Sequence, residues 1–171
     1  MHQTEMPTVP PPEEVRSYGE MAQLVKDHLP KNVIENIRKK IPIEIRPVNP
    51  VNLLNPEIRP AHKYVWFKSR EKLSDDLQLH KSILAYASDF ELLGTSMLPH
   101  GVSFMQRDMQ VASLDHALWF HQDFRIDDWL LYETDSPSAS QGRGFNRGNI
   151  YTRDGLLVAS VTQEGLIRKI K

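Results

Sequence analysis

Asp89 and Ser113 carry side chains that could take part in proton-transfer chemistry, although each also has an ordinary structural explanation. A carboxylate can accept a proton as a general base. Asp89 falls near the end of a predicted helix, where the macrodipole disfavours a negative charge, so a purpose other than helix stability is favoured. The Ser113 hydroxyl can donate one hydrogen bond while it accepts another, but a single serine at a strand end more often bonds the backbone.

Gln163 adds an amide, which both donates and accepts hydrogen bonds and does not titrate. Alternation along a predicted strand places Gln163 on the same face as Val161, with Thr162 and Glu164 on the opposite face. An inward amide is therefore favoured over an outward polar residue. No serine lies in a Gly-x-Ser-x-Gly elbow, so a covalent serine intermediate has no support in the sequence.

Asp115, His116 and His121 form a second polar group, and histidine and carboxylate side chains are common metal ligands. However, the His-x4-His spacing on a predicted strand matches no metal motif. We therefore expect no metal and no cofactor. Asp115 and His116 are expected to hold the geometry of a site or to line a channel beside it.

Three arginines recur in the late strands, namely Arg143, Arg147 and Arg153. Guanidinium groups bind phosphates well, whereas a solvated sheet face explains them equally well. Gly144 and Gly148 lie among these arginines. They fit bulges or close approach of the backbone better than a phosphate cradle.

A helix predicted over about 76–90 must position Asp89. Its apolar residues fall near helical spacing, and small residues near its end suit a helix buried against a sheet. Asp75 followed by Gln78 fits a capping box, and Gly94 fits a helix stop.

Strand patterns flank this helix on both sides. Extended segments are predicted at 41–48 and 63–70 before it, and at 109–121, 128–139, 143–155 and 156–170 after it. Asp154-Gly155 between two of these runs is a strong hairpin signal. The order predicts an α+β fold in which one long helix is wrapped by a curved, mostly antiparallel sheet.

The first 40 residues differ in character from the rest of the chain. Pro10-Pro11-Pro12 can neither form a helix nor pair in a sheet, and Pro30 should divide 13–40 into two short helices. We therefore expect residues 1–40 to be a linker-like segment with short helices, and residues 41–171 to form the main domain.

Composition is that of an average globular chain, with 171 residues, 40% hydrophobic and 25% charged. A net charge of −1 predicts no nucleic-acid partner and no attraction to an anionic membrane. No apolar run is long enough to span a bilayer. The absence of cysteine excludes a disulfide framework and suits an intracellular compartment.

Three strings of the sequence carry a specific family resemblance, "LAYASDFELLGTSMLPHG" at 84–101, "SLDHALWFHQDF" within 113–160 and "VTQEGLIR" at 161–168. They closely resemble the second half of type II acyl-CoA thioesterases, a family with bacterial members and a peroxisomal animal member. "PIEIRPVNP" at 42–50 resembles the segment that joins the two halves. The resemblance implies the hotdog fold, here as half of a double hotdog whose first domain is missing.

The resemblance also implies an activity and a site. The family's catalytic positions fall on Asp89, Ser113 and Gln163, which implies an acyl-CoA hydrolase that activates water with an Asp/Ser/Gln triad. Asp115, His116 and Arg143 are then expected to bind the acyl-CoA substrate. The animal branch implies peroxisomes, although the chain ends in Lys-Ile-Lys and not in a Ser-Lys-Leu type of address.

Two other interpretations stay open. A half-length chain could be catalytically incomplete and act as a binding or interaction module. A hotdog dehydratase would pair an acid with a histidine on the central helix, where His80 lies close to the helix start. In either case an exposed sheet edge predicts a homo-oligomer or pairing with a second hotdog domain.

Overall fold

The computed structural model describes residues 2–24 and 41–170. Two short helical elements, η1 (Pro12–Glu14) and α1 (Tyr18–Leu24), precede the sheet. The second helix expected before residue 40 lies outside the described residues. The remaining elements are β1 (Ile43–Pro47), β2 (His62–Ser69), α3 (Leu77–Ala87), η3 (Leu93–His100), β3 (Met109–Ser113), β4 (Ala117–Phe120), β5 (Leu130–Ser140), β6 (Arg143–Thr152) and β7 (Leu157–Lys169).

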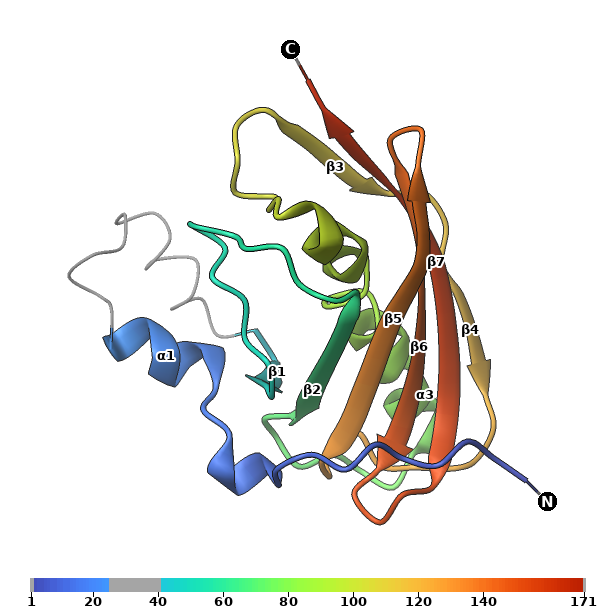
Figure 1. The fold of residues 1–171 in the computed structure, drawn as a ribbon. Coiled ribbons are helices and arrows are strands. Elements are labelled where there is room, and N and C mark those ends of the chain that lie inside the picture. Colours follow the sequence, from blue (N-terminus) through green and yellow to red (C-terminus); the bar gives the residue numbers. More distant parts are fainter. Residues whose placement is uncertain (1, 25–40, 171) are drawn as a thin grey trace.

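The strands form one antiparallel sheet in the order β1-β2-β5-β6-β7-β3, and β4 also pairs with β7. The sheet curls around α3 and η3, which lie together on its inner face (Figure 1). This arrangement confirms the predicted α+β fold. The hairpin between β6 and β7 is also confirmed, and Gly155 in its turn has φ of 93°, a conformation that glycine adopts without strain.

Helix α3 is shorter than predicted. Its N-cap is Asp76, not Asp75, because the Asp76 carboxylate accepts a hydrogen bond from the Gln78 amide at 2.9 Å. The helix ends at Ala87, and Gly94 is not its stop but lies within η3. Asp89 therefore sits in the turn between α3 and η3.

The single strand predicted at 109–121 is two strands, β3 and β4, separated by 114–116. The interruption is held in place by β7. The backbone amides of Leu114 and Asp115 both donate to the Glu164 carbonyl, and the Asp115 carboxylate accepts from the Glu164 amide at 2.7 Å. These local bonds replace the regular strand ladder there.

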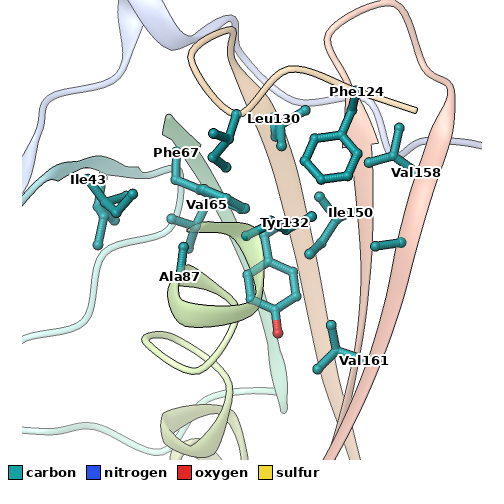
Figure 2. Packing of buried hydrophobic residues seen from close by; sticks show 14 of the residues in the cluster. Ile43, Val65, Phe67, Ala87, Phe124, Leu130, Tyr132, Ile150, Val158 and Val161 are labelled. Carbon is teal, nitrogen blue, oxygen red and sulfur yellow. The ribbon is translucent and has the colours of Figure 1, made fainter. Parts of the chain in front are cut away.

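The main hydrophobic core lies between the inner face of the sheet and α3. Figure 2 shows Phe67, Leu130 and Ile150 from three adjacent strands of the sheet together with Ala87 of α3. A Cβ atom at Gly144 would overlap Ser96 of η3, and one at Gly148 would overlap the Tyr132 ring. These glycines therefore serve close approach of the backbone, as predicted.

Part of the outer face of the sheet is covered by the N-terminal segment. Met6, Val9 and Val15 pack against a second apolar cluster that contains Trp66 and Tyr151. The Trp66 indole donates to the Pro10 carbonyl at 2.9 Å. Residues 2–15 therefore lie along the sheet and are not a free tether, and the chain can be followed across the lower end of the strands (Figure 1).

Two aromatic residues of β4 are exposed. Trp119 is 52% exposed and Phe120 is 39% exposed. They belong to β4, which pairs only with β7 among the described strands, so no further strand covers them. Within the described ranges, no helix has the length and apolar character needed to cross a membrane.

Candidate active site

Three separate elements bring polar side chains to the Asp89 carboxylate. Asp89 follows α3, Ser113 ends β3, and Gln163 lies in β7. The Ser113 hydroxyl donates to Asp89 Oδ1 at 3.2 Å, and the Gln163 Nε2 donates to the same oxygen at 2.5 Å. The structure thus joins three residues that are up to 74 positions apart in the sequence.

The burial of the three residues differs sharply. Gln163 is fully buried on the inner face of β7, as alternation with Val161 predicted, whereas the Asp89 side chain is 51% exposed. Among the described residues, both side-chain donors bond to Oδ1 of Asp89. Its Oδ2 therefore keeps its lone pairs for a solvent molecule or a substrate group, which is what a general base requires.

His116 extends this cluster on its inner side. Its Nδ1 lies 3.2 Å from Gln163 Nε2, and its Nε2 lies 2.9 Å from the Ser88 hydroxyl. The distance from Nδ1 to Asp89 Oδ1 is 3.9 Å, too long for a hydrogen bond. Sequence reasoning missed Ser88, whose only signal was its position next to Asp89.

Tyr132 lies beneath the same turn. Its hydroxyl donates to the Ser88 carbonyl at 2.9 Å. Burial raises the pKa of this phenol well above its ordinary value, and the nearby charges of Asp89 and Glu91 raise it further. Tyr132 therefore stays protonated and acts as a hydrogen-bond donor, not as a base.

Asp115 and Arg143 are not part of the cluster. Asp115 bonds the Glu164 backbone, and Arg143 Nη1 donates to the Glu164 carboxylate at 3.1 Å. Glu164 is adjacent to Gln163 in β7 and points to the opposite face of the sheet. Of the three predicted substrate-binding residues, only His116 lies within hydrogen-bond distance of a member of the cluster, namely Gln163.

His80 is occupied by the backbone. Its Nδ1 accepts from the Ile126 amide at 3.1 Å, so its Nε2 donates to the Ser74 carbonyl at 3.0 Å. Both nitrogens of this buried imidazole are therefore used, one to join α3 to the loop before β5 and the other to hold the loop before α3. In the described part of the chain, no three His, Asp or Glu side chains gather as metal ligands would.

Comparison with known proteins gives a consistent family signal. A family model described as acyl-CoA thioesterase matches residues 35–166. Acyl-CoA thioesterase 2 of Haemophilus influenzae is 38% identical over 167 residues, which cover 98% of this chain and 58% of that protein. Acyl-coenzyme A thioesterase 8 of Homo sapiens is 37% identical over 174 residues, which cover 98% of this chain and 54% of that protein.

Solved structures agree with this signal. The acyl-CoA thioesterase II TesB2 from Mycobacterium marinum has a TM-score of 0.74 at 40% identity, covering 99% of this chain and 57% of that chain. A protein with a hot dog fold from Alicyclobacillus acidocaldarius has a TM-score of 0.69 at 17% identity, which supports the fold alone. The hotdog prediction is confirmed. The chain spans about half the length of the relatives that it matches.

Proposed function

The chain belongs to the acyl-CoA thioesterase family, and on that premise we propose that it hydrolyses fatty acyl-CoA thioesters. Water activated by Asp89 attacks the thioester carbonyl carbon, with Ser113 and Gln163 completing the site. The convergence of Ser113 and Gln163 on one oxygen of Asp89 is the observation that carries this proposal. These two hydrogen bonds fix the plane of the Asp89 carboxylate and leave Oδ2 to accept a proton from water.

The chemistry follows from the two oxygens of Asp89. Oδ2 takes a proton from the attacking water, while Oδ1 stays bonded to the hydroxyl and the amide. The tetrahedral intermediate then expels the thiolate, which receives the proton from Asp89 and leaves as the CoA thiol. The fatty acid is the second product, and no covalent intermediate with the protein is formed.

The products of the reaction test this proposal. We expect the folded chain to convert a medium-chain or long-chain acyl-CoA into free thiol and fatty acid in equal amounts. Replacing Ser113 with Ala should lower kcat about tenfold, because one hydrogen bond to the base is lost. Mass spectrometry of the products checks the reaction class, and an enoyl thioester in place of free thiol would refute it.

Substrate recognition and location extend the same proposal. We propose that Arg143 contacts a phosphate of CoA, because its side chain is 52% exposed and its guanidinium could exchange Glu164 for phosphate. We propose that Asp115 contributes indirectly, by holding the backbone turn that carries His116.

Peroxisomes are the proposed location. A relative from Saccharomyces cerevisiae, 30% identical over 94 residues, bears the name peroxisomal acyl-coenzyme A thioester hydrolase 1.

A second candidate function is an incomplete half that binds acyl-CoA but turns it over only when paired. Two observations favour it: the 51% exposure of the Asp89 side chain and the half-length match to the relatives. Such a site excludes water poorly until another surface covers it. A folded chain that binds acyl-CoA without releasing thiol, and gains turnover when a second hotdog domain is added, would establish this function.

Pairing itself has a candidate surface. Tyr86 on α3 is 53% exposed and Phe120 on β4 is 39% exposed. Lys81 of α3 lies over the Phe120 ring, which places the helix beside this strand. We propose that the edge of β4 and the adjacent face of α3 pair with a second hotdog domain, which is another copy of the chain when it is purified alone.

Sedimentation measures this pairing. The wild-type chain should sediment as a dimer at micromolar concentration, and replacing Phe120 with Arg should shift it to monomer, because a charge would be buried in the interface. Phe145 is an exposed aromatic residue on the outer face of β6, so Phe145→Arg serves as the control and should stay dimeric. A wild-type monomer would contradict self-pairing.

A further inference from the structure

We propose that Ser88 and His116 form a positioning relay, which fixes the amide of Gln163 and, through it, the Asp89 carboxylate. The inference rests on the proposed hydrolase function. Ser88, His116 and Gln163 make a continuous hydrogen-bonded chain from the end of α3 to Asp89. Neither Ser88 nor His116 bonds the Asp89 carboxylate, so both act through Gln163.

The relay begins at a hydroxyl with a fixed direction. Ser88 is fully buried at the C-cap of α3, and its hydroxyl donates to the Ala85 carbonyl at 3.0 Å. A serine hydroxyl has one proton. Since that proton is used on Ala85, the contact of 2.9 Å with His116 requires that the imidazole Nε2–H be the donor.

The tautomer of the His116 imidazole in turn determines the orientation of the Gln163 amide. With the proton on Nε2, the Nδ1 of His116 carries a lone pair and accepts from Gln163 Nε2 at 3.2 Å. The second proton of the same amide nitrogen goes to Asp89. A reversed amide would place its oxygen against the Asp89 carboxylate and would lose both bonds, so His116 selects the orientation that serves Asp89.

The buried amide oxygen shows why a relay is needed. Gln163 Oε1 is buried and has no hydrogen-bond partner among the described residues. Nothing on that side of the amide therefore holds its orientation. The two bonds made by Nε2 are the ones that hold it, and one of them ends on His116.

Two substitutions of His116 separate the functions of its two nitrogens. The side-chain oxygen of Asn can occupy the position of Nδ1 and still accept from Gln163, whereas Gln can reach Ser88 but offers no acceptor at the Nδ1 position. We expect His116→Asn to keep most of kcat and His116→Gln to lose about 10- to 100-fold in kcat with KM unchanged. Equal losses in the two variants, or a loss confined to KM, would overturn the relay.

Ser88 should act only through the imidazole. Ser88→Ala should lower kcat about fivefold in the wild type, the effect of one net hydrogen bond. It should have no further effect in the His116→Asn background, where the Nε2–H is already absent. Independent effects that multiply in the double variant would contradict the proposed order of residues.

A spectroscopic measurement decides the relay without relying on turnover. The side-chain amide protons of Gln163, observed by NMR, should keep their chemical shifts in His116→Asn and move in His116→Gln. His121→Asn is the matched control, since His121 bonds the Ser160 hydroxyl at the same distance of 2.9 Å, away from Gln163. It should leave both the shifts and kcat unchanged.

The two proposals can therefore fail separately. An inactive wild type with the expected amide shifts would refute the hydrolase proposal and keep the relay. An active wild type whose Gln163 protons respond equally to all three variants would refute the relay alone.

Discussion

Replacing Asp89 with Asn should lower kcat for acyl-CoA hydrolysis about 10²- to 10⁴-fold, the range for removal of a general base. The amide of Asn cannot take a proton from water, and its nitrogen would meet the donors of Ser113 and Gln163 in one of its two orientations. KM should change little, because the substitution leaves the shape of the site intact. Continuous detection of released thiol measures both constants.

The fold should survive this substitution. The Asp89 side chain is half exposed and lies outside α3, so its replacement buries no new polar group. Asp108→Asn is a suitable control, because Asp108 is another half-exposed acid, which pairs with Lys169 at 3.2 Å. Unchanged turnover in Asp89→Asn beside an unchanged Asp108→Asn would remove Asp89 from the mechanism.

Replacing Asp127 with Ala should produce the largest loss of stability among the acids of the described chain, by roughly 2 to 4 kcal/mol. Asp127 is buried, and both of its oxygens accept from the Arg125 guanidinium at 3.0 Å. The Leu73 amide donates to it as well, at 3.0 Å. The carboxylate thus ties the loop before α3 to the loop before β5, and chemical denaturation measures the loss.

Asp135 provides a matched control. It also forms a two-point pair with an arginine, Arg147, but on the outer face, where the arginine side chain is 54% exposed. Asp135→Ala should cost less than about 1 kcal/mol, because solvent screens an exposed ion pair. Equal losses at Asp127 and Asp135 would show that burial does not set the contribution of these pairs.

The effect of Asp127 should depend on pH. The hydrogen bonds from Arg125 hold the pKa of this carboxyl well below its ordinary value, against the opposing effect of burial. Its contribution to stability is therefore complete above the unfolded pKa of about 3.9 and is lost as the pH falls through the lower folded pKa. The difference between wild type and Asp127→Ala should be largest near neutral pH and should shrink in acid.

Local patterns predicted most of the elements. The strands at 128–139, 143–155 and 156–170 are close to β5, β6 and β7, because alternation and the Asp154-Gly155 turn act within a few residues. Inward burial of Gln163 followed from the same alternation. The exposure of Trp119 could not be predicted in this way. A hydrophobic residue favours burial, but β4 lies at the edge of the sheet.

Contacts between distant residues account for what sequence reasoning missed. The break between β3 and β4 depends on bonds from Leu114 and Asp115 to Glu164, about 50 positions away. Alternation tells which neighbours share a face with Arg143 or with Gln163 within a single strand. Only the register of β6 with β7 shows that Arg143 and Gln163 occupy opposite faces of the sheet. Ser88 carried no chemical motif, and its contact with His116 appears only once α3 is docked on the sheet.

We propose that Asp89 activates water and does not attack the substrate itself. A single turnover with excess protein in ¹⁸O-labelled water tests it directly. We expect the fatty acid of this first turnover to carry one ¹⁸O atom and the Asp89 carboxylate to carry none. An unlabelled fatty acid in the first turnover, with label appearing in Asp89, would contradict the account, as would a folded chain that releases no thiol.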